Sequence, residues 1–149
     1  MYAKLRKQIE FEEGRRLHVY RCTAGHRTIG IGHNLDAKPD YHGSPIPNTI
    51  TNDECDAIFT EDINEVITGL KRVWPQFTLL DDARRDAVAN MAFQLGVGGV
   101  MKFKNMIACL NKQDWRGAYN AGLDSQWAKQ TPARAKRVLT QILTGVYYA

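Results

Sequence analysis

The chain has 149 residues, of which 44% are hydrophobic and 24% are charged, and it carries a formal net charge of +4 with a pI near 9.0. This composition is typical of a globular protein and excludes a disordered chain, and no apolar run is long enough to span a membrane. The many charged residues between positions 4 and 13 predict that a signal peptide is absent. Cys22, Cys55 and Cys109 lie far apart and form no CxxC pair, so free thiols are expected.

The N-terminal stretch, residues 3–12, is predicted to be a helix because apolar residues recur four positions apart. Gly14 can take the left-handed conformation that ends a helix, so Glu13 falls in the last helical turn. There the negative end of the helix dipole and the neighbouring Glu12 both favour a protonated carboxyl group, as a general acid requires. When Glu13 is considered alone, a solvated surface glutamate is the alternative.

A short strand is predicted around residues 17–21, followed by a turn and a second strand from Arg27 to His33. The second strand would carry Ile29, Ile31 and His33 on its core face, and Thr28, Gly30 and Gly32 on the opposite face. Two glycines on one face indicate that something approaches the backbone closely. A pair of bulges or a bend is the alternative.

The middle of the chain contains a loop and then a long helix. Residues 35–49 include several prolines and are predicted to form an irregular loop. Thr51 and Glu54 form a capping box, and the helical period continues from there to about Arg72, where Trp74–Pro75 ends it. We interpret this helix as a rod that joins two lobes.

The remainder is predicted to be helical. One segment runs from a cap at Asp81 or Asp82 to Gly96, and the last runs from Thr131–Pro132 to Gly145. Between them, residues 100–110 and 115–123 form shorter amphipathic segments.

Basic residues gather late in the chain, at Arg84, Arg85, Arg134, Lys136 and Arg137. They could attract a polyanion, either nucleic acid or an acidic cell wall, or they could simply form a solvated helix face.

Glu13, Cys22 and Thr28 are spaced like the Glu–Asp/Cys–Thr set of the phage-type lysozymes. The segments EEGRRLHVY and TIGIGHNL are similar to the opening of that family, and ITNDECDAIFTEDI, NMAFQLGVGG and QTPARAKRVLTQILTG extend the likeness over most of the chain. The sequence therefore resembles these endolysin muramidases, and within them the lysozymes of T-even phages.

The resemblance implies an α+β, mostly α-helical fold, in which two lobes form a single lysozyme domain over residues 1–149. A small β-containing lobe is expected over about residues 13–50, a connecting helix over about 51–72, and a helical lobe over about 73–149 together with 1–12.

The resemblance also implies a muramidase that cleaves the β-1,4 bond between N-acetylmuramic acid and N-acetylglucosamine in peptidoglycan. Glu13 would be the general acid, and Thr28 and Cys22 would aid the attack of water in an inverting reaction. Cys22 occupies a position that is aspartate in the nearest relatives; a thiolate could replace that charge if its pKa were lowered, and a small buried hydrophobe is the alternative.

Other positions take their expected roles from the family. Substrate contacts are expected from the following residues: Gly30, Gly32, Asn34, Phe93 and Gln94. Arg134 resembles the arginine that pairs with the catalytic glutamate, and His33 and Asp62 resemble a structural pair rather than metal ligands. The family implies no metal and no cofactor.

Two features depart from the family pattern. Met106 and Ala121 stand at cleft positions where polar side chains are expected, so sugar contacts there are in question. The loop at 35–49 replaces a longer helical segment, so we expect a reduced small lobe with a more open or more mobile cleft rim.

The expected partner is peptidoglycan, bound by a monomer with no nucleic acid and no stable membrane association. Synthesis in the host cytoplasm would be followed by action on the wall in the periplasm, after a holin has permeabilised the membrane. The alternatives are a catalytically impaired lysozyme-fold module, which would bind the wall or belong to a phage tail or toxin, and a nucleic-acid-binding protein that uses the basic C-terminal helix.

Overall fold

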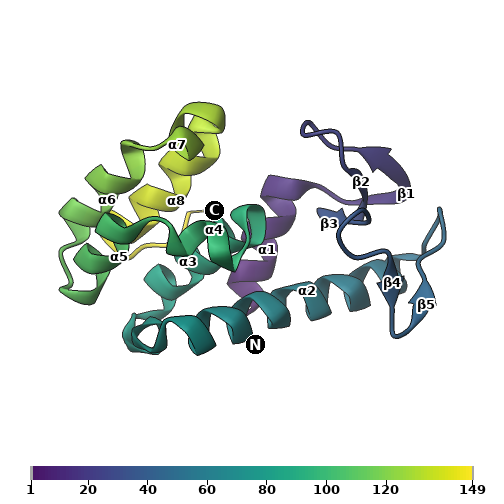
Figure 1. The fold of residues 1–149 in the computed structure, drawn as a ribbon, viewed down its shortest axis with the longest axis horizontal. Helices are drawn as coiled ribbons and strands as arrows, with labels where there is room; N and C mark the ends of the chain where they lie inside the picture. The colour runs from purple at the N-terminus through teal and green to yellow at the C-terminus, as the bar shows by residue number, and fades with distance from the viewer. Residues whose placement is uncertain (1, 149) are drawn as a thin grey trace. The chain divides into compact units, whose positions relative to one another are not determined.

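The computed structural model describes residues 2–148 and contains eight α-helices and five short strands within them (Figure 1). The elements follow in this order: α1 (Ala3–Glu13), β1 (Arg16–Arg21), β2 (Arg27–Gly30), β3 (His33–Asn34), β4 (Asp40–Tyr41), β5 (Ser44–Pro45), α2 (Asn52–Val73), the 3-10 helix η1 (Pro75–Leu79), α3 (Asp82–Leu95), α4 (Val97–Met101), α5 (Lys104–Asn111), α6 (Trp115–Leu123), α7 (Gln126–Gln130) and α8 (Pro132–Thr144). The predicted α+β, mostly helical fold is confirmed. None of the described helices combines the length and the apolar character needed to cross a membrane.

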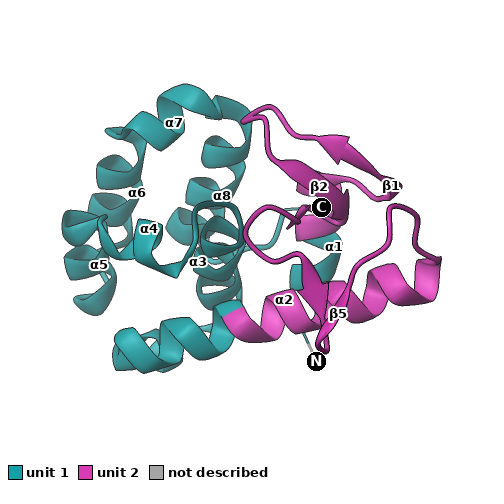
Figure 2. Cartoon of the chain, turned by 45° about the vertical axis from the view of Figure 1, so that its right-hand side comes forward, with its two compact units in different colours: residues 1–8, 66–149 teal, residues 9–65 magenta. Residues whose placement is uncertain are grey.

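The chain divides into two compact units, and the divisions fall inside α1 and α2 (Figure 2). Unit 1 comprises residues 1–8 and 66–149, and unit 2 comprises residues 9–65. Each of the two dividing helices therefore supplies residues to both units.

Unit 2 contains the strands. β1, β2 and β3 form an antiparallel sheet in that order, and β4 and β5 form a separate two-stranded hairpin. Ile29 and Ile31 are buried, as predicted, together with Ile50 and Phe59.

The predicted strand from Arg27 to His33 is wrong beyond Gly30, where the chain turns and His33 begins β3. Gly30 and Gly32 have φ values of 65° and 64°, in the left-handed region that strands avoid and that glycine tolerates. The continuous glycine-bearing strand face therefore does not exist, and the bend that we considered as the alternative is what these glycines form.

The predicted irregular loop at 35–49 contains regular structure that we missed. β4 and β5 are joined by His42 and Gly43, whose φ values are 50° and 80°. Positive φ at both central residues is the conformation of the tight hairpin turns. Each strand has two residues, which is too short for an alternating pattern to be recognised.

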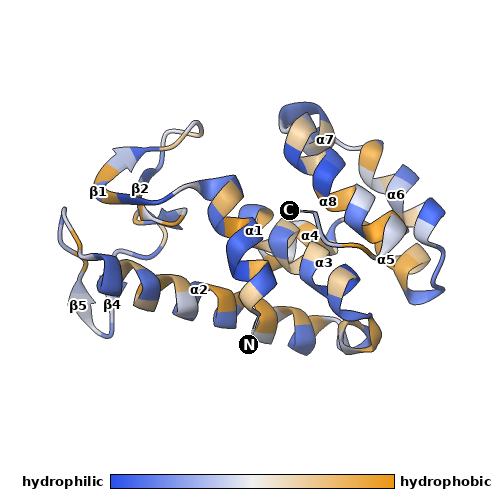
Figure 3. Ribbon diagram, turned by 180° about the vertical axis from the view of Figure 1, so that it is seen from behind, coloured by the Kyte–Doolittle hydropathy of each residue, from blue (hydrophilic) through white to orange (hydrophobic). Residues whose placement is uncertain are grey.

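Helix α2 begins and ends as predicted. Thr51 Oγ1 accepts a hydrogen bond from the Glu54 N–H at 3.1 Å, and Glu54 Oε1 accepts one from the Thr51 N–H at 2.9 Å, which completes the capping box. The helix ends at Val73, immediately before Trp74–Pro75. Hydrophobic and hydrophilic residues alternate around it in Figure 3, as expected for a helix that buries one face.

Unit 1 is a cluster of helices in which α6 packs against α5 and α8, and α8 packs against α3. Its core is apolar and contains large side chains that are almost fully buried: Leu70, Trp74, Phe77, Met91, Leu110, Leu139 and Ile142. Asp81 caps α3 by accepting the Arg84 N–H, and Gly96 follows the helix, both as predicted.

The C-terminal helix begins at Pro132 and ends before Gly145, whose φ of 70° is left-handed, so both predicted bounds are confirmed. The predicted cap by Thr131 is wrong, because its hydroxyl donates to the Trp127 carbonyl at 3.1 Å and caps nothing in α8. The single segment predicted at 100–110 is also wrong, since α4 ends at Met101 and α5 begins at Lys104. Helix α7 was not predicted.

Candidate active site

Glu13 is the last residue of α1, as its position before Gly14 predicts. Gly14 has a φ of 74° and its N–H donates to the Glu10 carbonyl at 2.8 Å, which closes the final turn. The Glu13 carboxylate is half-buried and lies against the backbone of Gly32.

Cys22 and Thr28 meet across the hairpin that β1 and β2 form. The Cys22 N–H donates to the His26 carbonyl at 3.0 Å, and the Thr28 hydroxyl donates to the same carbonyl at 2.9 Å. Thr28 is 4% exposed, so its hydroxyl is fixed in place rather than solvated. The hairpin turn therefore brings together two of the three residues that the family resemblance names.

The hairpin also sets the ionisation of the Cys22 thiol. Desolvation raises its pKa, but hydrogen bonds to the sulfur outweigh this effect and the pKa is lowered overall. The groups that lower it are the backbone amides of the turn at His26, Ala24 and Gly25, together with the nearby Thr28 hydroxyl. Stabilising the thiolate is the condition that a charged role for Cys22 requires.

Tyr20 belongs to this neighbourhood, although sequence reasoning did not single it out. It is paired in register with Thr28, and the Arg16 guanidinium lies 4.5 Å from its ring centre. Desolvation raises its pKa, and the negative charges of Glu13 and Cys22 raise it further. Both groups therefore lie within electrostatic reach of one phenol. The available signal was its position two residues before Cys22, which directly follows the strand that contains Tyr20.

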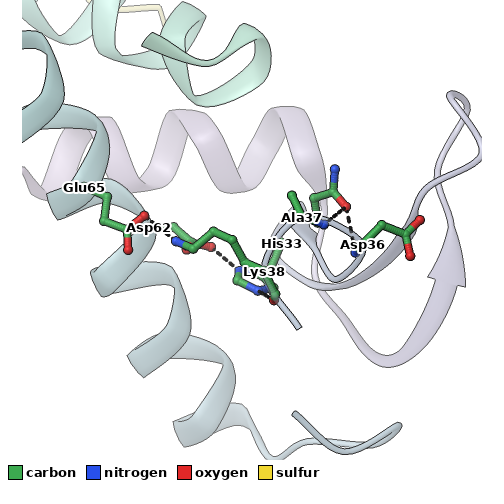
Figure 4. A network of polar contacts seen from close by, with 7 residues as sticks. His33, Asp36, Ala37, Lys38, Asp62 and Glu65 are labelled. Carbon is green, nitrogen blue, oxygen red and sulfur yellow. Dashed lines mark hydrogen bonds and ion pairs between the residues drawn. The ribbon is translucent and has the colours of Figure 1, made fainter. Parts of the chain in front are cut away.

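His33 and Asp62 lie together, and Lys38 joins them (Figure 4). His33 Nδ1 is 2.6 Å from Asp62 Oδ2, and His33 Nε2 is 2.8 Å from the Lys38 carbonyl. Both ring nitrogens thus face acceptors, which favours the imidazolium: desolvation lowers the pKa of His33, but Asp62 and the carbonyl raise it by more. Lys38 Nζ donates to Asp62 Oδ1 at 3.1 Å and also pairs with Glu65.

The structure thus gives His33 and Asp62 a place in a hydrogen-bonded network. Among the described residues, no group of three or more His, Cys, Asp and Glu side chains is arranged to hold a metal ion.

Asn34 and Gly30 have structural partners of their own. Asn34 Oδ1 accepts the N–H groups of Asp36 and Ala37 at 2.9 and 3.1 Å, so it closes the turn that follows β3. A Cβ at Gly30 would lie 3.3 Å from the sulfur of the buried Cys55, so that position faces the core. Substrate contact by either residue stays a prediction.

In unit 1, the Gln94 side chain contacts Trp127, which lines a cavity of about 470 Å³. Its side-chain oxygen accepts the indole N–H of Trp127 at 2.9 Å, and its amide donates to Thr131 at 3.3 Å. Trp127 lines the cavity with charged and apolar neighbours: Lys102, Phe103, Lys104, Met106, Ala121 and Asp124. Phe93 precedes Gln94 in α3 and is half-buried. The two departures from the family pattern, Met106 and Ala121, are thus both on the wall of one cavity.

The late basic residues do not form a free patch. Arg134 is 8% exposed and donates to the Asn90 side chain at 2.9 Å. Arg84 donates to the carbonyls at the end of α8, Arg85 pairs with Asp86, and Lys136 donates to the hydroxyl of Tyr119. These side chains therefore have partners inside unit 1, and binding of a nucleic acid stays an untested alternative.

Comparison with known proteins adds to this geometry. The family model for phage lysozyme matches residues 10–143. The chain is 39% identical over 152 residues to the pre-baseplate central spike protein Gp5 of Enterobacteria phage T4, covering 90% of this chain and 26% of that protein. It is 30% identical over 171 residues to "Probable T4-type lysozyme 1" of Dictyostelium discoideum, covering 100% of this chain and 99% of that protein.

An endolysin of Acyrthosiphon pisum secondary endosymbiont phage 1 is 31% identical over 106 residues, which cover 71% of this chain and 66% of that protein. The chain therefore spans about a quarter of the length of the spike protein but almost the whole length of the Dictyostelium protein.

Proposed function

The chain belongs to the phage lysozyme family, and from this we propose that it is a peptidoglycan hydrolase that cleaves the β-1,4 bond between N-acetylmuramic acid and N-acetylglucosamine. The observation that carries the proposal is the family match over residues 10–143, which includes Glu13, Cys22 and Thr28. The match supports glycoside hydrolase activity, and the roles of individual residues are our proposals.

Glu13 is the proposed general acid. It would protonate the leaving oxygen of the glycosidic bond, a task for a carboxyl group held at a fixed position and shielded from bulk water. Its place at the end of α1, half-buried and against the β2–β3 turn, supports this role.

Thr28 and Cys22 are proposed to hold the attacking water on the opposite face of the sugar, which leads to inversion at the anomeric carbon. The Thr28 hydroxyl donates to the His26 carbonyl, and its oxygen can still accept a hydrogen bond from water. The lowered pKa of Cys22 supports a thiolate that stabilises the positive charge developing on the sugar.

Substrate contacts are proposed at these positions: Gly30, Asn34, Phe93 and Gln94. Arg134, His33 and Asp62 are proposed as supporting residues. The charged and aromatic walls of the unit 1 cavity suit the mixed polar and apolar surface of a glycan that carries peptides.

For the biological role we propose lysis of a host cell by a monomer that reaches the wall after a holin has opened the membrane. A second candidate is favoured by one observation, the 39% identity to a phage central spike protein. It is a lysozyme-fold module of a tail or toxin that binds the wall with weakened catalysis.

The test is digestion of purified peptidoglycan by the wild type and by Glu13→Gln, with mass spectrometry of the products. We expect the wild type to release fragments with muramic acid at the reducing end, and proton NMR of the first products to show the inverted anomer. Glu13→Gln should fold normally and lose activity by at least about 100-fold. Near-normal digestion by Glu13→Gln would refute its assignment, and wall binding without digestion by the wild type would favour the second candidate.

A further inference from the structure

Gly32 lies directly beneath the Glu13 side chain. A Cβ built on Gly32 would be 2.7 Å from Glu13 Oε1, 2.9 Å from Cδ and 3.0 Å from Cγ. Carbon atoms do not approach one another or oxygen so closely without displacement, so the carboxylate occupies the space that any other residue at position 32 would fill.

Other glycines of unit 2 with positive φ show that this contact is not a general feature of its turns. Gly14, Gly25 and Gly43 have φ values of 74°, 85° and 80°, and a Cβ on any of them would meet nothing within 4 Å. Those positions require glycine for backbone conformation alone. Gly32 has the same conformational requirement and, in addition, the Glu13 carboxylate packs against its α-carbon.

We propose that Gly32 is a positioning residue for Glu13. Because Gly32 has no side chain, the Glu13 carboxylate can pack against its α-carbon, and this packing contact fixes where the carboxylate lies. This inference rests on the proposed role of Glu13 as the proton donor. It replaces the idea from the sequence that a sugar approaches this glycine, because the group that approaches it is the side chain of the acid itself. General acid catalysis depends on that position, since a misplacement of about 1 Å can cost on the order of 100-fold in rate.

The backbone that carries Glu13 is fixed independently, by a clamp around Arg15. The Arg15 guanidinium pairs with Glu10 of α1 at 3.1 Å and with Asp56 of α2 at 2.6 Å, and it donates to Asn52 of α2 at 3.2 Å. The end of α1 is thereby tied to the start of α2. A methyl group at position 32 would therefore displace the flexible Glu13 side chain rather than the helix, since the far end of a side chain moves more easily than a tied backbone.

Gly32→Ala is the variant to test, with Gly43→Ala as the matched control. Both substitutions place alanine at a positive φ, and each should lower Tm by a similar amount, on the order of 5 °C. With soluble uncrosslinked peptidoglycan strands as substrate, we expect kcat of Gly32→Ala to fall about 100-fold while KM stays within about twofold of the wild type. Gly43→Ala should keep wild-type kcat and KM.

Three results would overturn the inference. A wild-type kcat in Gly32→Ala would show that the position of the Glu13 carboxylate does not depend on its contact with Gly32. An equal loss of kcat in Gly43→Ala would assign the effect to backbone strain. A rise in KM with unchanged kcat would make Gly32 a substrate contact.

Two further variants keep the test decisive. If Gly32→Ala does not fold, the substitution is combined with Glu13→Ala, which removes the side chain that the new methyl group would overlap. The double variant should then fold as well as Gly43→Ala. If the double variant also fails to fold, the contact between Gly32 and Glu13 is not the cause, and the inference is refuted. Glu13→Gln separates the two levels of the argument. If that variant remains active, the proposed function fails, whereas if it is inactive and Gly32→Ala is active, the positioning role alone fails.

Discussion

In unit 2, charged pairs join the loops to the helices around a small apolar core, whereas unit 1 is built from closely packed helices. In unit 2, basic side chains from the strands and loops contact carboxylates on α1 and α2: Arg15 with Glu10 and Asp56, His33 with Asp62, Lys38 with Asp62 and Glu65, and His42 with Glu61. In unit 1, the contact between α6 and α8 is so close that a Cβ on Gly122 would lie 2.9 Å from Leu139 Cδ1.

The difference follows from size. Unit 2 spans residues 9–65, and a segment of that length buries a smaller fraction of its surface than a larger domain does. Charged and hydrogen-bonded pairs add to its apolar core by tying its loops to its helices. These pairs make the unit that carries Glu13, Cys22 and Thr28 sensitive to pH.

Unit 1 also contains a buried charge, but its partners do not titrate near neutrality. Asp86 is 1% exposed and binds Arg85 and the Tyr147 hydroxyl. Desolvation and the hydrogen bond to Asp86 raise the pKa of Tyr147 well above its ordinary value, and Arg85 stays charged throughout the physiological range. We therefore expect the stability of unit 1 to vary little between about pH 5 and 8.

Asp62→Asn should have the largest effect on stability, because the Asp62 carboxylate pairs with two basic side chains, the buried His33 and the partly exposed Lys38. The raised pKa of His33 means that the pair contributes fully below about pH 6.5, the ordinary value, and that this contribution is lost as the pH rises through the raised pKa. We expect Asp62→Asn to lower the free energy of unfolding by about 3 kcal/mol at mildly acidic pH and by less at alkaline pH. Urea unfolding at several pH values measures this.

Asp53→Asn is the control for that prediction, because Asp53 is an exposed carboxylate in the first turn of the same helix. Its small cost should not change with pH. Hydrogen exchange should place the destabilisation by Asp62→Asn in residues 27–41, and a loss that is uniform over pH would contradict the role assigned to the His33 imidazolium.

Gly122→Ala tests the opposite side of the comparison. The added methyl group overlaps Leu139, so we expect a loss of about 2 kcal/mol that is independent of pH and of salt. Gly98→Ala is the matched control: Gly98 also lies in a helix, but a Cβ there would meet nothing within 4 Å, so the change should be neutral or stabilising by about 0.5 kcal/mol. Thermal unfolding of both variants measures the contrast, and equal effects would mean that the α6–α8 contact can relax.

Those features of the fold that depend on residues close in sequence could be predicted from it. Thr51 and Glu54 satisfy each other three residues apart, and Gly14 and Gly145 end helices through their own φ angles, so each signal is complete within one turn. Thr131 has the same chemistry as a cap, but its hydroxyl is taken by Trp127 and Gln94, which lie outside α8. A local pattern cannot reveal such a competitor.

The candidate site shows the same limit. The spacing of Glu13, Cys22 and Thr28 was sufficient to name them, and the hairpin brings the last two together. Gly32 was singled out for a close approach, but the approaching group proved to be Glu13, which only the folded chain reveals. Tyr20 was missed because an aromatic residue in a strand is ordinary, and its significance lies in the charges around it.

The smallest expected effect concerns reactivity rather than stability, and it separates two cysteines of unit 2. Desolvation raises the pKa of the buried Cys55, whereas the hairpin lowers the pKa of Cys22 despite partial desolvation. Alkylation of Cys22 by iodoacetamide should therefore rise with a midpoint below about pH 8.5, the ordinary value for a thiol. Tryptic peptides separate the two sites, because Cys22 falls in peptide 22–27 and Cys55 in peptide 28–71.

Cys55, at 1% exposure, should react slowly at every pH, and in urea both cysteines should titrate alike. Thr28→Val provides the matched variant, since it keeps the shape of the side chain and removes the hydroxyl that helps to lower the pKa of Cys22. It should move the Cys22 midpoint upward while leaving Cys55 unchanged. A Cys22 midpoint in the folded protein equal to that in urea would show that the hairpin does not stabilise the thiolate, and Cys22 would then act as a neutral side chain.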